Sequence, residues 1–360
     1  MSTELRVEPG DPAKLTSSPD EPSSVVTVSS RLRRWLRGNW IFGVLVLIVV
    51  LFSVASPYFL TQSNWLNTSL SATEILLLAV GETFVIITGG IDLSVGANLG
   101  LSGMVGGWLM QYFFSKHGLP SGSPVLATSL GFAAAILAGT IVGAANGLLV
   151  AGFEIPPFVV TLGTLGVCTG LGDLIANGQE ISVIPAAVGN IGNYNLLGWF
   201  PIPVVVAALI TLILAVVLAR TKFGANTYAI GDSREAAVRA GIADRRHLLW
   251  VYTLTGLLAG VASIAVMSRL SAAAPTSGSD DNLNAIAAVV IGGASLFGGR
   301  GTIFGSVVGT SIIAVLLTGL IIVNVPSFWQ LVAVGLVLIA AVYVDQIGQG
   351  QRPSLKRLLR

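Results

Sequence analysis

A glycine pair followed by a carboxylate occupies residues 89–96, where the sequence reads Gly-Gly-Ile-Asp-Leu-Ser-Val-Gly. Gly89 and Gly90 end one apolar run, and a second apolar run begins after Asp92 and Ser94. Side-chain oxygens of Asp and Ser accept hydrogen bonds from free N–H groups at helix starts, so both residues are placed to cap the second helix. An acid at membrane depth is costly, and broken helices often border a substrate path. The segment therefore predicts either a helix cap or a broken helix beside a translocation path.

Three further acids fall within or at the end of apolar runs. Glu74 and Glu82 are eight residues apart and therefore lie near one face of a helix. Asp173 ends a later run. Acids inside membrane helices often form ion or proton relays, whereas acids at the membrane surface cost little. A proton-coupled transporter that uses Glu74, Glu82 and Asp92 is one hypothesis that these acids leave open.

A second glycine-rich element, residues 292–302, repeats the pattern of the first. Both elements contain a glycine pair, a leucine three residues later and a glycine six residues later. We expect the likeness to reflect shared turn chemistry and not an inverted repeat. Arg300 suits a turn on the cytoplasmic side of a membrane.

A long basic segment, residues 221–242, separates two apolar runs and is the strongest signal in the sequence. Asp232 stands three residues before Glu235, a spacing that resembles a capping box with Asp in place of Ser or Thr. Alanines at positions 236, 237 and 240 favour a helix, and Gly241 is typical of a helix end. The segment predicts a short cytoplasmic helix whose small residues admit a close partner. A helix that only faces solvent is the alternative.

The composition indicates that a membrane surrounds these elements. Hydrophobic residues make up 53% of the 360 residues and charged residues only 10%, against about 25% in soluble domains. We place ten apolar segments, each near the roughly 20 residues that a spanning helix needs. Their ranges are 40–56, 72–88, 93–111, 125–150, 158–176, 203–220, 247–267, 284–297, 302–323 and 328–345. The eighth segment is short, so we expect it to be re-entrant or broken.

The basic residues indicate the orientation. If the amino terminus is cytoplasmic and each segment crosses once, only Lys116 and Arg269 of the 19 lysines and arginines lie outside. We therefore expect an all-α polytopic membrane protein with about ten transmembrane helices, one or two of them short or broken, and both termini in the cytoplasm. The expected parts are a disordered tail at 1–38, a membrane domain at 39–345 with a cytoplasmic loop at 221–246, and a C-terminal tail at 346–360.

Residue counts argue against several kinds of enzyme. One cysteine, Cys168, and two histidines, His117 and His247, cannot supply a zinc site, and so little histidine makes a Ser-His-Asp triad improbable. None of the four lysines follows a glycine, so the sequence has no phosphate-binding loop. We expect a transport subunit that binds no metal, no ATP or other cofactor, and no nucleic acid.

Glycine is frequent, with 43 residues, and many glycines are spaced by four. Rows of small residues at this spacing let membrane helices approach closely. The rows are Gly96/Gly100, Gly103/Gly107, Gly139/Gly143/Gly147, Gly166/Gly170 and Gly305/Gly309. We therefore expect a tightly packed helical bundle.

Three motifs resemble those of permeases from ATP-binding-cassette importers. Glu235-Ala236-Ala237 followed by Gly241 resembles the EAA-type coupling motif of that class. The runs at 89–96 and 289–309, the second reading VVIGGASLFGGRGTIFGSVVG, are similar to the ribose-type permease family. The likeness extends in order over residues 40–345.

The resemblance implies a permease of the bacterial inner membrane that imports a monosaccharide or related small polar solute. It also implies a second permease subunit, two cytoplasmic ATPase subunits that bind ATP, and an extracytoplasmic solute-binding protein. The residues that would contact the ATPase are Arg234, Glu235, Ala236, Ala237, Arg239 and Gly241. A branched-chain amino-acid or nucleoside permease, or a proton-coupled transporter, is the alternative.

A path for such a solute would need small polar groups and an aromatic ring. By residue type and expected depth, the candidates are Asn98, Asn146, Phe153, Thr161 and Thr164, together with Gly89, Gly90, Asp92 and Ser94. The sugar-type runs at 89–96 and 292–302 favour a sugar over an amino acid.

Overall fold

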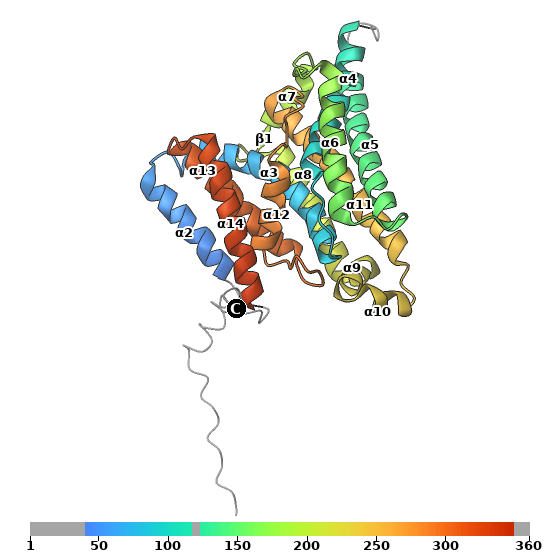
Figure 1. Cartoon of the computed structure of the whole chain (residues 1–360). Helices are drawn as coiled ribbons and strands as arrows, with labels where there is room; N and C mark the ends of the chain where they lie inside the picture. Colours follow the sequence, from blue (N-terminus) through green and yellow to red (C-terminus); the bar gives the residue numbers. More distant parts are fainter. Residues whose placement is uncertain (1–39, 117–122, 349–360) are drawn as a thin grey trace, which may run out of the picture. The chain divides into compact units, whose positions relative to one another are not determined.

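The computed structural model describes residues 40–116 and 123–348, most of which lie in helices (Figure 1). The expected N-terminal tail, His117 and most of the expected C-terminal tail lie outside these residues. The elements are α2 (Trp40–Ala55), α3 (Gln62–Ile87), α4 (Val95–Gln111), a π-helical turn η1 (Tyr112–Lys116), α5 (Pro124–Ala151), α6 (Pro157–Ala176), α7 (Ala186–Asn193), the hairpin β1 (Asn195–Leu196) and β2 (Phe200–Pro201), α8 (Ile202–Arg220), α9 (Lys222–Asp232), α10 (Arg234–Arg239), α11 (Asp244–Leu270), α12 (Asp281–Ile291), α13 (Ile303–Ile322) and α14 (Ser327–Gly348).

Each of the ten apolar segments overlaps a helix. Within the described residues, α3, α5, α6, α8, α11 and α13 are long and apolar enough to cross a membrane. Shorter apolar helices cover Ile41–Ala55, Asp281–Ile291 and Ser327–Tyr343. The arrangement is consistent with the polytopic membrane protein that the composition predicts.

Helix starts follow local capping rules. Thr61, Ser123 and Thr302 each accept a hydrogen bond from an N–H group in the first turn of α3, α5 and α13. α3 begins at Gln62, ten residues before the predicted start at 72. The apolar pattern missed these turns because their residues are mostly polar.

α3 lies among α8, α11, α12 and α13, which all pack against it (Figure 1). In its most apolar stretch 78% of the residues are buried, against 22% in α6 and in α8. α3 is therefore the central helix of the core, while α6 and α8 present apolar side chains outward, as a lipid environment requires.

The glycine rows do not all serve the same purpose. On α5, a Cβ atom at Gly143 would lie 2.8 Å from the Cα atom of Gly256 on α11, so the close packing predicted for this row is confirmed. On α6, a Cβ atom at Gly166 or Gly170 would meet no atom of the described chain within 4 Å. The expected contact is wrong for the α6 row within this chain, because that helix face is open.

The eighth segment forms only a short helix. An irregular stretch of turns, residues 271–280, precedes α12, and Ala273 within it exchanges two backbone hydrogen bonds with Ile181 (2.8 and 3.0 Å). The stretch runs along α4, where a Cβ atom at Gly100 would lie 2.8 Å from Ser277 O. α12 has only 11 residues and rises about 16 Å, roughly half of a bilayer core. The predicted short or broken helix is confirmed, and the glycines of α4 accommodate irregular backbone instead of another helix.

Candidate functional site

The helices α9 and α10 lie together at one end of the bundle, which we call the basic end (Figure 1). Its cationic residues are Arg220, Lys222, Arg234, Arg239, Arg245 and Arg246. The break after α3 and the turn after α12 both meet α9 at this end. The candidate site is therefore built from three segments that are far apart in the sequence.

The first glycine element ends α3 at the basic end. Gly89 has φ +84°, a conformation that glycine adopts without strain. Gly89 N donates to Ile86 O (2.9 Å) and Gly90 N donates to Val85 O (3.0 Å), which closes the helix in a Schellman arrangement. The helix break predicted from the glycine pair is present.

The second glycine element ends α12 in the same way. Gly293 has φ +90° and donates through its N–H to Val290 O (2.9 Å). Ala294 N donates to Val289 O (3.1 Å). The predicted shared turn chemistry is confirmed, because both elements place a left-handed glycine directly after a helix.

Asp92 stabilises the turn between α3 and α4 and not the start of α4. Its Oδ1 accepts hydrogen bonds from Ser94 N (2.9 Å) and Ser94 Oγ (2.6 Å). Ser94 is the N-cap residue of α4 but makes no side-chain cap bond. The prediction that both side chains cap α4 is wrong, because the two residues bond each other.

A chain of buried polar side chains continues from this turn. Asn146 of α5 donates through Nδ2 to Ser94 Oγ (2.9 Å), and Thr164 of α6 donates to Asn146 Oδ1 (2.6 Å). Asp92, Ser94 and Asn146 are each at most 2% exposed. Hydrogen bonds between buried groups restrict geometry strongly, so this series of side chains fixes the helix break relative to α5 and α6.

The other predicted path residues fall into two sets. Asn98 donates to Gly139 O (3.2 Å) and Thr161 donates to Ile91 O (3.3 Å), and both side chains are buried. Phe153 is 69% exposed in the turn between α5 and α6. The structure thus places the four polar candidates near the helix break and leaves Phe153 apart from them.

The basic segment holds two helices where the sequence predicts one. Because α9 runs through Asp232, the N-cap of α10 is Ser233, whose Oγ accepts a hydrogen bond from Ala236 N (3.3 Å). The predicted capping role of Asp232 is therefore wrong. Gly241 follows α10 with φ +84° and donates to Val238 O (2.9 Å), so the predicted glycine end is confirmed.

α10 has one buried face and one exposed face. Ala237 is 4% exposed and packs with Ile230 and Leu248 of its own chain. The exposed residues of α10 and its C-cap are Arg234, Glu235, Ala236, Val238, Arg239 and Ala240. The expectation that Ala237 faces a partner needs correction, because this side chain holds α10 against α9 and α11.

Two ion pairs hold the basic segment in place. Arg234 Nε lies 2.7 Å from Asp244 Oδ2, which ties α10 to the start of α11. Arg245 pairs with Glu154 in the turn between α5 and α6. Arg239 pairs with Glu235 one turn earlier in α10 (3.4 Å), and both side chains are at least 80% exposed. Arg234 thus anchors α10 to α11, whereas the pair of Glu235 and Arg239 lies on the exposed surface of α10.

Close contacts join α9 to the end of α3 and to the loop between α12 and α13, and we call Ile87, Tyr228, Gly231, Gly299 and Gly301 the glycine junction. Gly299 N donates to Ile87 O (2.9 Å), and Tyr228 Oη donates to Gly301 O (2.7 Å). A Cβ atom at Gly231 would lie 2.6 Å from Gly299 N and would overlap Ile87 O. Burial raises the pKa of Tyr228, so its phenol remains a donor at neutral pH. α9 is therefore packed directly against both glycine elements.

The acids named in the proton-relay hypothesis have different surroundings. Glu74 accepts two hydrogen bonds from Arg269 (2.8 and 3.1 Å). Glu82 is fully buried in α3, whereas Asp173 is exposed near the end of α6. Glu74 is therefore the ion-pair partner of Arg269 in the last turn of α11.

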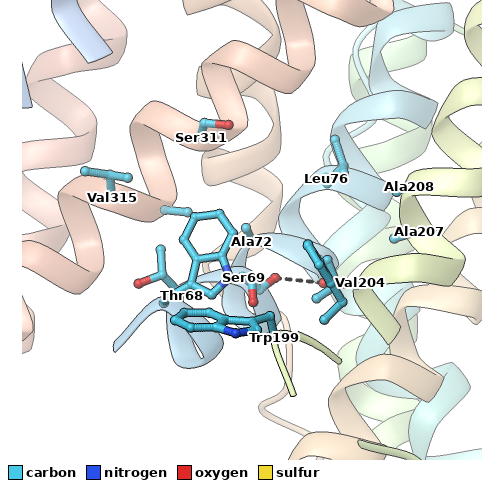
Figure 2. Close-up of a pocket in the computed structure, with 14 residues that line it drawn as sticks. Thr68, Ser69, Ala72, Leu76, Trp199, Val204, Ala207, Ala208, Ser311 and Val315 are labelled. Atoms are coloured by element: carbon cyan, nitrogen blue, oxygen red, sulfur yellow. Dashed lines mark hydrogen bonds between the residues drawn. The ribbon is translucent and has the colours of Figure 1, made fainter. Parts of the chain in front are cut away.

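A small cavity of about 230 Å³ lies between α3, α8 and α13 (Figure 2). Figure 2 shows Trp199 beside Thr68 and Ser69, with Val204 on the wall. Most other lining groups are aliphatic or aromatic. The cavity suits an apolar group and offers few hydrogen bonds to a polar solute.

The chain is similar to known transport proteins over most of its length. The family described as branched-chain amino acid transport system / permease component matches residues 64–342. The ribose import permease protein RbsC of Bacillus subtilis (strain 168) is 41% identical over 305 residues, which cover 84% of this chain and 90% of that protein. The D-allose transport system permease protein AlsC of Escherichia coli (strain K12) is 37% identical over 307 residues (85% and 90%). The fructose import permease protein FrcC of Rhizobium meliloti is 38% identical over 277 residues (75% and 74%). No solved structure matches the chain.

Proposed function

The chain belongs to the permease family described as branched-chain amino acid transport system / permease component, and we propose that it is the membrane subunit of an ATP-binding-cassette importer for a monosaccharide. The similarity to permeases named for ribose, allose and fructose carries this proposal. The apolar helices and the helix pair at the basic end support it. The chain would act as a transport subunit, with ATP hydrolysis on a separate ATPase.

We propose ten crossings, with both termini in the cytoplasm of a bacterial inner membrane. The basic end then faces the cytoplasm, as the positive-inside rule requires. The irregular stretch 271–280 and α12 together would form one crossing, an arrangement supported by the contact of Gly299 with Ile87 at the basic end. Single cysteines near Lys116 and near Arg246, in a Cys168→Ser background, should react with an impermeant reagent from opposite sides. Labelling of both from one side would contradict this topology.

The exposed face of α10 is our proposed contact with the ATPase. Exposed Glu235 and Arg239 would mainly set specificity at its rim. Ion pairs and Ala237 hold α10 to α9 and α11, and the glycine junction links α9 to the two helix breaks. ATP-driven movement of the partner would thereby reach the membrane helices as a rigid displacement.

The open face of α6 is our proposed contact with a second permease subunit. Its glycines meet no atom of the described chain, and large apolar side chains such as Leu162 and Val167 are exposed beside them. Small residues on such a face permit close helix packing in a membrane. An extracytoplasmic binding protein would deliver the solute at the end opposite to the basic end.

Reconstitution of the permease with its ATPase and binding protein tests the function. Uptake of D-ribose, D-allose or D-fructose should require ATP and should resist a protonophore. Leucine and uridine serve as probes of the amino-acid and nucleoside alternatives. Uptake of leucine or uridine instead of every sugar would reject the solute class. Uptake that a protonophore abolishes and ATP does not drive would reject the importer itself.

A further inference from the structure

The irregular stretch before α12, residues 271–280, ends at a polar cavity of about 460 Å³ between α12, α13 and α14. This polar cavity lies toward the end opposite to the basic end, where α14 begins. Its lining includes two carboxylates, two carboxamides, a hydroxyl and an aromatic ring: Asp280, Asp281, Asn284, Gln330, Thr276 and Phe328. Irregular backbone at membrane depth occurs where it is buried in protein or borders a water-filled path, and such breaks often mark a substrate site.

Several acceptors in the polar cavity are left for a ligand. Asn284 is only 7% exposed and donates through Nδ2 to Asp281 Oδ1 (3.2 Å). Among the described residues no hydrogen bond reaches Asn284 Oδ1, although this side chain lines the cavity. Asp280 occupies the N-cap position of α12 but its carboxylate makes no cap bond. Asn284 Oδ1 and the exposed carboxylate of Asp280 are therefore acceptors that a ligand with O–H or N–H groups can reach.

A partly buried ion pair lies near the carboxylates. Arg269, whose side chain is 29% exposed, pairs with Glu74 (2.8 Å) and donates to Ser71 Oγ (2.9 Å). Asp280 has no cationic partner among the described residues, so its exposed carboxylate repels anions such as sugar phosphates. Carboxylate oxygens also accept hydrogen bonds from neutral hydroxyl groups.

We infer that the polar cavity binds a neutral solute with several hydroxyl groups as it enters the permease. Asp280 and Asn284 would accept hydrogen bonds from the hydroxyls, and the exposed ring of Phe328 would cover an apolar face of the solute. The inference rests on the proposed function, whose solute is a monosaccharide. The cavity beside Trp199 is a poorer candidate, because its lining is mostly apolar.

The test compares transport with ATP hydrolysis in the complete reconstituted importer. Asp280→Ala and Asn284→Ala should each lower sugar uptake per ATP hydrolysed by about tenfold or more, as expected when a hydrogen bond to a charged or buried group is lost. ATPase activity stimulated by the loaded binding protein should stay within about twofold, since neither residue lies near the glycine junction. Glu180→Ala removes an exposed acid outside the cavity and should change neither quantity.

A binding measurement separates a sugar from a cation. Phe328→Trp places an indole at the cavity, and titration in nanodiscs with the sugar that the wild type imports should change its fluorescence, whereas the wild type should show no such change. A response to calcium chloride and not to the sugar would overturn the inference in favour of a cation site.

The proposed function and this inference fail in different ways. If the wild type imports none of the three sugars, the proposed solute class is wrong. If the wild type imports a sugar, and both alanine variants take up as much of that sugar per ATP hydrolysed as the wild type does, the polar cavity is not the binding site of the sugar.

Discussion

The glycine junction and the polar cavity are built from different parts of the chain. At the junction, Gly299 N meets Ile87 O and the backbone of Gly231 fills the remaining space. Around the polar cavity the contacts are made by side chains, including Asn284 with Asp281 and, behind them, Arg269 with Glu74. One region therefore depends on where the backbone lies, and the other on which side chains it carries.

If the glycine junction transmits movement from an ATPase and the polar cavity binds the solute, as proposed above, the two regions should respond differently to substitution. Close-packed backbone transmits a displacement because it has no room to absorb it. Side chains around a cavity can be exchanged while the helices keep their places. Substitutions at the junction should therefore be hard to rescue, whereas paired substitutions near the cavity should compensate each other.

The largest effect is expected for Glu74→Ala. Arg269 would then lose its ion-pair partner at a partly buried site, where its side chain is 29% exposed, which should reduce the free energy of unfolding by about 3 kcal/mol. The double variant Glu74→Leu/Arg269→Met removes both charges and should recover most of that loss. Unfolding in detergent with increasing denaturant measures both. A double variant as unstable as Glu74→Ala would show that side chains near the polar cavity cannot be exchanged more readily than residues of the glycine junction.

A smaller effect, which a second substitution should not rescue, is expected for Gly231→Ala. The added Cβ meets backbone atoms of Ile87 and Gly299, so α9 must move, at a cost of about 1–3 kcal/mol. Transport should fall further than stability, because the displaced helix lies between the ATPase contact and the helix breaks. Gly335→Ala on α14, where a Cβ would meet no atom within 4 Å, is the control. Wild-type uptake by Gly231→Ala would show that the junction tolerates displacement.

Local sequence rules predicted the features that depend on neighbouring residues. The glycine pair at 89–90 and Gly241 were identified as helix ends because a left-handed residue after a helix favours glycine wherever it occurs. The apolar runs likewise predicted the long helices, because this signal also lies in neighbouring residues. The exact cap of α10 was missed, since Asp232 belongs to α9 and Ser233 takes the cap position.

Contacts between distant segments were not predictable from local rules. The spacing of Gly96 and Gly100 indicated close packing, but nothing in it distinguishes a helix partner from the irregular stretch that lies there. Tyr228 and Gly231 stand about one turn apart in the basic segment, yet their partners belong to α3 and to the loop before α13. The polar cavity likewise joins residues that meet only once α12, α13 and α14 are assembled.

Gly241→Val introduces backbone strain without a steric clash, and it should have an intermediate effect on the coupling of ATP hydrolysis to uptake. Gly241 has φ +84° and open space around its Cα, so Gly241→Val costs about 1–2 kcal/mol through backbone conformation alone. Co-purification of the ATPase and ATP-driven uptake should both decrease, while membrane insertion remains. Gly178→Val, which has φ +73° at the end of α6 and equally open space, matches the strain away from α10. Equal ATPase recovery with both variants would reject α10 as the contact.

The smallest effect is expected for Ser233→Ala, which removes the cap of α10 and leaves its packing unchanged. The cap bond from Ala236 N to Ser233 Oγ measures 3.3 Å, at the long end of the hydrogen-bond range, so we expect a loss of about 0.5–1 kcal/mol. That loss should appear as a several-fold faster hydrogen exchange at the amides of α10, with exchange in α3 unchanged. Ser233→Asp keeps a cap acceptor and should restore slow exchange. If Ser233→Ala slowed transport as much as Gly231→Ala, coupling would depend on the order of α10 itself and not on the backbone contacts of α9.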